Sequence, residues 1–149
     1  MPPAAAATAV VRLLDALIFN WVIGGTDAHA KNYSLLLAGR RLQLAPLYDL
    51  ASALPYPGMP IQRLRLAMKF GGSYSLRTRD ATMWPAVATE LDLALDLVIE
   101  RARALVARIP DAFASVAAEP GVLDLASPLP GVLVDAVAER ASGCAACLP

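Results

Sequence analysis

The strongest constraint on the fold is a long apolar segment, residues 9–25, that ends in two consecutive glycines. A helix that is apolar around most of its circumference is stable only inside a core. We therefore predict a central buried helix that is capped at its start by Thr8 and ended by Gly24 and Gly25. Residues 1–7 are expected to be disordered or to be a truncated N-terminus. The side chains expected in the core are Val11, Leu14, Ala16, Leu17, Ile18, Trp21 and Val22.

Composition limits the class of protein. The chain has 149 residues, enough for one domain with its own core, and 57% of them are hydrophobic. This share is above that of a typical soluble domain, so the chain either buries an unusual share of its surface or lacks a partner that covers it. Arg12, Asp15 and Asn20 leave no uninterrupted run of the roughly 20 apolar residues that span a bilayer. The start also has no basic segment typical of a signal peptide, so we expect a cytoplasmic protein without a membrane partner.

The charges are unevenly distributed although the net charge is zero. Residues 27–79 contain eight Lys or Arg and two Asp, whereas residues 80–149 contain ten Asp or Glu and four Arg. A basic first half suits an anionic ligand such as a nucleotide phosphate or a nucleic acid. Solvated strand faces would produce the same pattern, so charge alone leaves both interpretations open.

Two cysteines, Cys144 and Cys147, are spaced C-A-A-C near the C-terminus. A single pair of this kind, far from the one histidine of the chain, is weak evidence for zinc or redox chemistry. We expect a reduced pair in a frayed tail formed by residues 143–149.

Two β-hairpins are expected in the first half. Apolar runs at residues 33–37 and 41–44 flank a glycine-containing turn, as in a hairpin. Apolar and basic residues then alternate over residues 63–70, which is the period of a half-buried strand, and residues 74–77 would pair with it. The inward positions of this alternation are Leu64, Leu66, Met68 and Phe70.

The second half is expected to be helical. The predicted helices run from Asp80 or Thr82 to residue 91, with Pro85 in the first turn, from Asp92 to Pro110, on to about residue 118, and from residue 127 to residue 140. The second of them has one apolar stripe: Leu95, Val98, Ala102, Leu105, Val106 and Ile109. The fold class is therefore α+β, a mostly helical lobe over residues 8–142 with small hairpins.

The segment GGTDAHAKN, residues 24–32, places chemically active side chains between the buried helix and the first hairpin. Phosphoryl transfer needs a carboxylate to orient the attacking hydroxyl, and oxygen ligands to hold Mg²⁺. Kinase catalytic loops supply these groups as Asp-x-x-x-x-Asn, and Asp27 and Asn32 have that spacing. Asp49 follows the hairpin, where a second metal-binding Asp is expected.

The stretches GTDAHAKNYSLLL, LAPLYDLASAL and LRLAMKFGG together resemble the C-terminal kinase lobe of the HipA-type serine/threonine kinases, the toxins of bacterial toxin–antitoxin pairs. The resemblance implies that Asp27 is the catalytic base, with Asn32 and Asp49 as ligands of Mg²⁺ bound with ATP. It also places His29 and Lys31 where a donor or positive group steadies the transferring phosphoryl. Lys69 and Arg65 are candidates for phosphate or substrate contacts.

The same resemblance implies partners. The family has an N-terminal lobe with a phosphate-covering loop, and no such loop is found in this sequence. We therefore expect a separate N-terminal lobe or a HipB-like antitoxin as partner, a protein substrate with a Ser or Thr, and contact with nucleic acid only indirectly through an antitoxin.

Two other functions stay open at this stage. One is a small-molecule phosphotransferase of the aminoglycoside/choline kinase type, although those enzymes usually have a histidine where this chain has Gly25. The other is a non-catalytic remnant that acts as an antitoxin-binding module; the basic half is compatible with it, but no helix-turn-helix pattern supports it.

Overall fold

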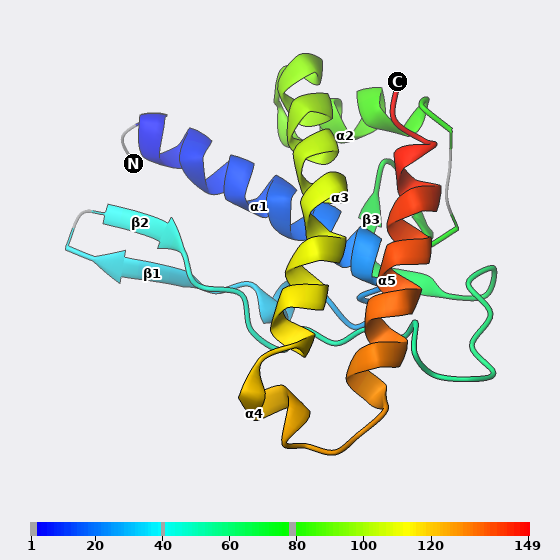
Figure 1. The fold of residues 1–149 in the computed structure, drawn as a ribbon. Coiled ribbons are helices and arrows are strands. Elements are labelled where there is room, and N and C mark those ends of the chain that lie inside the picture. Colours follow the sequence, from blue (N-terminus) through cyan, green and yellow to red (C-terminus); the bar gives the residue numbers. More distant parts are fainter. Residues whose placement is uncertain (1–2, 40, 78–79) are drawn as a thin grey trace.

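The computed structural model describes residues 3–39, 41–77 and 80–149, and shows one long helix crossed by a helical pair (Figure 1). Helix α1, Pro3–Ile23, has Leu14, Ile18 and Trp21 fully buried, so the predicted central helix is confirmed. It begins before Thr8, so the expected cap and the expected disorder of residues 3–7 are wrong. Consecutive alanines explain the difference because alanine has the highest helix propensity.

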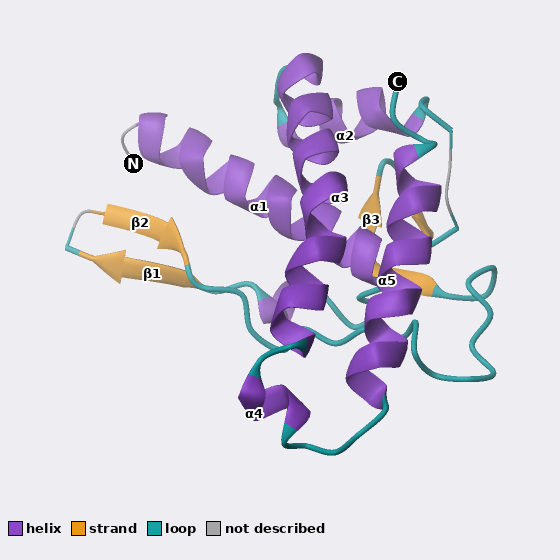
Figure 2. Cartoon of the chain, viewed as in Figure 1, coloured by secondary structure: helices purple, strands orange, loops and turns teal. Residues whose placement is uncertain are grey.

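The remaining helices form the second half of the chain: α2, Met83–Leu91, α3, Leu95–Ala117, α4, Pro120–Leu123, and α5, Leu129–Ala145. Helix α3 packs along both α1 and α5. The predicted stripe of α3 is confirmed at four positions, where the side chains are buried: Val98, Ala102, Val106 and Ile109. Together with the strand pairs this gives the expected α+β class, with helix dominant (Figure 2).

Two predicted helix limits are wrong. Asp92 does not cap α3; it ends α2 in a left-handed conformation with φ 52°. Pro110 does not end α3, which runs through it to Ala117. Proline removes one backbone hydrogen bond, and the packing of α3 against α1 and α5 is extensive enough to keep the helix intact on both sides.

Both predicted hairpins are present. Strands β1, Leu35–Ala38, and β2, Arg41–Leu44, pair antiparallel, as do β3, Arg65–Phe70, and β4, Ser73–Ser75. The alternation of β3 is confirmed, because Leu66 and Phe70 are buried. In the first hairpin, β2 lies along α1 (Figure 1). The leucines of β1 are exposed.

An aromatic cluster joins distant parts of the chain at the centre of the core. The rings of Trp21 and Trp84 are 5.6 Å apart and nearly perpendicular, and Phe70 lies within 6.0 Å of both. Such edge-to-face pairs stabilise beyond the area they bury. Trp84 Nε1 also donates a hydrogen bond of 2.8 Å to the carbonyl of Cys147, which fixes the C-terminus to the core.

The C-terminal residues are therefore not a frayed tail. Helix α5 continues to Ala145, and both cysteines are buried in the thiol form. Burial raises the pKa of the Cys144 thiol to about 12. A thiol that stays protonated is neither a good metal ligand nor a reactive nucleophile, so Cys144 has a structural role.

Arg140 is an unusual core residue because it is buried without a carboxylate partner among the described residues. Its Nη2 donates hydrogen bonds to the carbonyls of Leu76, at 2.6 Å, and Trp21, at 3.3 Å. Its guanidinium carbon lies 5.3 Å from the centroid of the Trp21 ring, within cation–π range. Burial lowers the pKa of Arg140. One side chain thus ties α1, α5 and the second hairpin together.

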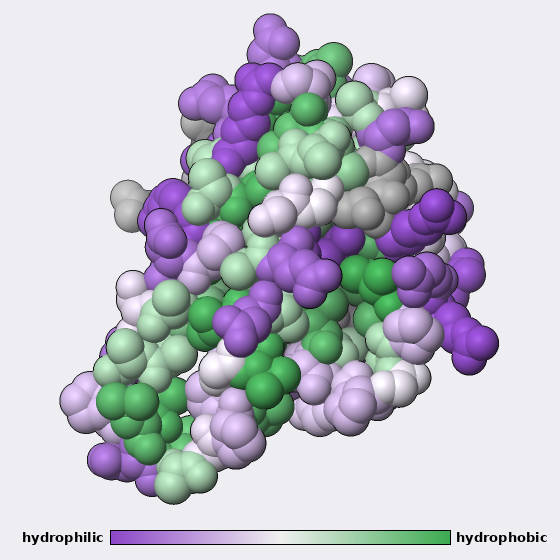
Figure 3. All heavy atoms as spheres, turned by 45° about the vertical axis from the view of Figure 1, so that its right-hand side comes forward, coloured by the Kyte–Doolittle hydropathy of each residue, from purple (hydrophilic) through white to green (hydrophobic). Residues whose placement is uncertain are grey.

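Residues Ala6–Ile23 of α1 are long and apolar enough to cross a membrane by length and composition alone. In the fold this segment supplies the core, and its Asp15 accepts a hydrogen bond of 2.8 Å from Nε of Arg101 on α3. The packing of α1 therefore accounts for its composition. Hydrophobic side chains also gather on the surface at the lower end of the molecule, around α4 (Figures 1 and 3).

Candidate functional site

The candidate site begins where α1 ends in a tight turn. Gly24 has φ +68°, a left-handed conformation that glycine adopts without strain. The amide of Gly25 donates a hydrogen bond of 2.8 Å to the carbonyl of Asn20. A Cβ on Gly25 would lie 2.3 Å from Oδ1 of Asn20, and one on Gly24 would lie 2.7 Å from Cγ of Leu54. Both glycines are therefore required by close approach, and they set the direction of the loop that follows.

The loop after this turn presents Asp27 to solvent. The Asp27 side chain is 77% exposed, and Nε2 of His29 lies 3.9 Å from its Oδ1. The amide of His29 donates to the carbonyl of Asp27 at 2.8 Å, which holds the two residues in one turn. The side-chain atom Nδ1 of His29 is buried and has no hydrogen-bond partner among the described residues. The expected catalytic carboxylate is thus accessible, and the His29 side chain lies beside it.

A short 3₁₀ turn, η1, Ala30–Asn32, then changes the direction of the chain. Lys31 is exposed on this turn, whereas Asn32 is 5% exposed and points inward. Nδ2 of Asn32 donates a hydrogen bond of 2.8 Å to Oδ2 of Asp49. Two residues that are 17 positions apart, and that the sequence assigned to one metal site, are therefore in direct contact.

Asp49 has the backbone conformation of a specialised turn. Its φ is +55°, which is uncommon for residues other than glycine and is tolerated best by Asp and Asn. Asp49 lies in the loop that follows strand β2, and its carboxylate accepts the hydrogen bond from Asn32. Left-handed non-glycine residues often lie at functional sites.

Hydrogen bonds that the sequence did not predict hold the two loops together. The hydroxyl of Tyr48 donates to the carbonyl of Lys31 at 2.7 Å and lies 2.8 Å from Oγ of Ser34. Oγ of Ser52 donates to the carbonyl of Ile23 at 2.5 Å, at the end of α1. The position of Tyr48 next to Asp49 was the only indication in the sequence that Tyr48 belongs to the site. That position does not predict which atoms its hydroxyl bonds to.

Tyr33 connects the loop to α1. Nδ2 of Asn20 donates a hydrogen bond of 3.2 Å to the Tyr33 hydroxyl and one of 3.0 Å to the carbonyl of Ala16. Burial raises the pKa of Tyr33, and the hydrogen bond from Asn20 lowers it in part. Asn20, which interrupts the apolar helix in the sequence, is thus a structural support of the loop.

The basic candidates on β3 are less closely connected. Lys69 and Arg65 are both exposed, and Nζ of Lys69 lies 5.8 Å from the ring of Tyr74. Within the described residues, no ion pair or hydrogen bond joins either of them to Asp27, Asn32 or Asp49.

The site offers two metal-ligand side chains, Asn32 and Asp49, rather than a closed metal cluster. The described part of the chain contains no group of three or more His, Cys, Asp or Glu that could hold an ion. Mg²⁺ in phosphoryl-transfer sites is commonly bound by one or two protein side chains together with phosphates and water. The hydrogen bond between Asn32 and Asp49 uses Nδ2 of the first and Oδ2 of the second. Oδ1 of each side chain does not take part in this bond, and both are oxygen atoms of the kind that Mg²⁺ prefers.

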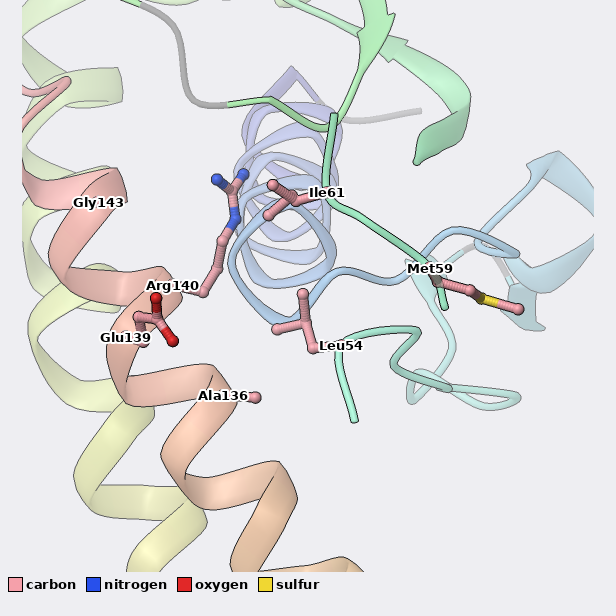
Figure 4. Close-up of a pocket in the computed structure, with 7 residues that line it drawn as sticks. All are labelled: Leu54, Met59, Ile61, Ala136, Glu139, Arg140 and Gly143. Carbon is pink, nitrogen blue, oxygen red and sulfur yellow. The ribbon is translucent and has the colours of Figure 1, made fainter. Parts of the chain in front are cut away.

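A cavity of about 300 Å³ lies beyond Asp49, between the following loop and α5 (Figure 4). The figure shows Leu54 and Ile61 on one side and the stem of Arg140 on the other, with Glu139 beside it. Asp27, Asn32 and Asp49 do not line it. The candidate residues therefore lie outside this cavity.

This order of buried helix, Asp/Asn loop, hairpin and second Asp defines a kinase-like α+β lobe. The comparison with sequence families is more specific, because the model of the HipA-like C-terminal domain matches residues 2–116. The chain belongs to the HipA-like C-terminal domain family.

Relatives support this assignment. The chain is 39% identical over 135 residues to "Putative kinase Y4mE" of Sinorhizobium fredii, covering 91% of this chain and 31% of that protein. It is 32% identical over 104 residues to the serine/threonine-protein kinase toxin HipA of Shewanella oneidensis, covering 70% of this chain and 23% of that protein. It spans only about a quarter to a third of these proteins.

The fold is also similar to a solved structure. A chain in the complex of Shewanella oneidensis HipA, HipB and operator DNA superimposes with a TM-score of 0.66 and 27% identity. The match covers 97% of this chain and 33% of that chain. The expected family and fold class are therefore confirmed, as a C-terminal part of a HipA-like protein.

Proposed function

We propose that this chain is the catalytic and metal-binding part of a HipA-like serine/threonine protein kinase, which transfers the γ-phosphate of ATP to a Ser or Thr hydroxyl. The observation that carries the proposal is the 2.8 Å hydrogen bond between Asn32 and Asp49. It joins the loop that presents Asp27 to the second Asp that such chemistry requires. The name of the Shewanella relative, a serine/threonine-protein kinase toxin, supports the substrate class.

In this mechanism Asp27 orients the attacking hydroxyl and accepts its proton. A solvent-facing carboxylate suits this role, because a protein substrate must reach it. His29 and Lys31 lie on the same short loop and supply donor or positive groups beside the transferring phosphoryl. Positioning and electrostatic stabilisation are the main contributions a protein makes to phosphoryl transfer.

Asn32 and Asp49 are the proposed ligands of Mg²⁺. When bound, this ion neutralises the charge of the ATP phosphates. Burial of Asn32 and the constrained backbone of Asp49 keep both side chains in place before any ligand arrives. Such preorganisation reduces the entropy lost on binding.

The proposed enzyme needs further parts. The chain spans 33% of the superimposed HipA chain, so we assign the phosphate-covering lobe to the rest of a longer protein or to a separate chain. A HipB-like antitoxin is the proposed partner, since the Shewanella complex contains HipB and operator DNA. Contact with DNA would then be indirect, and the setting would be the cytoplasm.

The first test is calorimetry of ATP binding with and without Mg²⁺. We expect binding that requires Mg²⁺, and a loss of at least about tenfold in affinity for Asp49→Asn, because removal of an ionic ligand weakens a metal site strongly. Asp92→Asn is the matched control: Asp92 is also exposed and left-handed, with φ 52°, but lies at the end of α2.

A second variant separates binding from chemistry. Asp27→Asn is expected to bind Mg-ATP as the wild type does. Its free energy of unfolding should stay within about 0.5 kcal/mol of the wild-type value, because the residue is exposed. Its transfer of labelled γ-phosphate, measured in the presence of the other lobe, should fall by a hundredfold or more, in the range of general-base loss. Absence of Mg-ATP binding by the folded wild-type chain even with the other lobe present, or an equal loss in Asp92→Asn, would contradict the proposed site.

A further inference from the structure

A second surface feature lies away from the residues discussed so far. The end of α3, the short helix α4 and the start of α5 enclose an open groove of about 360 Å³. Phe113 lines it, and its ring centroid lies 6.2 Å from that of Phe19 on α1. The side chains that line it are all apolar: Ala112, Phe113, Val116, Ala117, Val122, Leu129, Pro130, Leu133 and Val134.

The groove is not covered by the described part of the chain. Val116 and Leu129, which line it, are 52% and 43% exposed. Three more exposed apolar residues lie on the same elements and their connection: Leu123, Leu125 and Val132. Hydrophobic surface is visible at the lower end of the molecule (Figure 3). Contiguous apolar surface of this kind marks interaction sites.

The charged residues of the segment that forms the groove have one sign. Residues 109–138 contain no Lys, Arg or His, and their four carboxylates are all exposed: Asp111, Glu119, Asp124 and Asp135. Each is within two residues of one that lines the groove, and Glu119 and Asp124 flank α4 at its two ends. In the described residues none of the four forms an ion pair within 4 Å.

We propose that this groove binds an amphipathic helical segment of another protein, with apolar side chains on one face and Lys or Arg beside them. Helices bind grooves between helices through apolar anchors spaced three and four residues apart. The carboxylates would attract the flanking cations and set the orientation of the segment. The proposal does not depend on phosphoryl transfer, because none of the candidate catalytic residues lines the groove.

The same charges argue against other occupants. Nucleic acid, an anionic membrane and a fatty acid would all bring negative charge to an acidic rim. A second copy that used the same groove in a twofold contact would place like carboxylates against each other.

The family match ends at residue 116, so most of the residues that line the groove lie outside the segment that the family model matches.

The test uses two designed helical peptides of about 18 residues, with leucines at i, i+3, i+4 and i+7. One has lysines beside the leucines and the other has glutamates. Fluorescence anisotropy with the full chain should show binding of the lysine peptide that weakens with salt. Binding of the glutamate peptide should be at least about tenfold weaker, because several carboxylates each contribute roughly 1.5- to 5-fold.

Variants locate the contact. Val116→Glu places a charge in the groove at an exposed position and should lower the affinity for the lysine peptide by tenfold or more. Val132→Glu is the matched control, since Val132 is 47% exposed but does not line the groove, and binding should stay within about twofold. The double variant Glu119→Gln, Asp124→Asn should reduce the salt dependence.

Three results would overturn the proposal. Equal affinity for both peptides would show an apolar site without charge preference. Failure of both peptides to bind a folded monomeric chain would show that the groove takes no helical partner of this kind. Self-association that Val116→Glu abolishes and Val132→Glu preserves, seen by analytical ultracentrifugation, would make a second copy of the chain the occupant.

Discussion

Two neighbouring regions of the chain are stabilised in different ways. Around Trp21 the structure depends on buried aromatic rings and one buried arginine. Six residues later, Asp27 lies on a loop that is held mainly by hydrogen bonds from residues of a second loop, such as Tyr48. The core should therefore respond most to changes in volume, and the loops to changes in backbone geometry, while the exposed carboxylates contribute little to stability.

The largest effect should come from the aromatic cluster. Trp84→Ala removes a fully buried ring and the hydrogen bond to Cys147, and is expected to lower the free energy of unfolding by about 3–5 kcal/mol. Urea denaturation measures this change. Tyr56→Ala, at a half-exposed aromatic, is the control and should stay within about 1 kcal/mol. Equal losses would mean that the cluster is not the centre of the core.

A smaller effect is expected at the turn that begins the candidate site. Gly25→Ala would bring a methyl group 2.3 Å from Oδ1 of Asn20, and the forced shift should cost about 1–3 kcal/mol. Binding of Mg-ATP should weaken as well, since Asn20 supports Tyr33 in the loop. Gly121→Ala is the control, because open space surrounds that position in α4. A neutral Gly25→Ala would show that the turn tolerates a side chain.

The smallest effect concerns the pH dependence of the core. The pKa of Cys144 is about 12 in the folded chain, above the ordinary value of 9.0. Between these values the unfolded chain releases the proton while the folded chain keeps it, so stability is full below pH 9 and falls as pH rises. We expect a loss of about 1 kcal/mol between pH 8.5 and 10. In Cys144→Ala the free energy of unfolding should depend less steeply on pH over this interval. An unchanged slope would mean that other groups cause the pH dependence.

Local patterns were sufficient to predict several parts of the molecule. The burial of α1 follows from apolar residues on most sides of one helix, and the alternation of β3 follows from neighbouring residues. Asn32 and Asp49 were assigned to one Mg²⁺ site from spacing and family resemblance, and the structure joins their side chains by a hydrogen bond. The catalytic and metal-binding roles of these residues remain predictions.

The misjudged features depend on contacts between distant residues. Pro110 continues a helix because α3 packs on α1 and α5, and the C-terminal residues are ordered because Trp84 donates to Cys147, 63 positions away. The bond from Tyr48 to the carbonyl of Lys31 needs two loops to be correctly placed first. Sequence patterns of one segment contain no information on such pairings.

The contacts of Arg140 have a consequence for the order of events during synthesis. Its partner carbonyl on Trp21 is 119 positions earlier in the chain. Chains emerge from the ribosome N-terminus first, so the part of the α1 surface that α5 covers stays exposed until almost the whole domain has been translated. This delay makes the nascent helix a natural client for a molecular chaperone, and rare codons before residue 140 would lengthen its exposure.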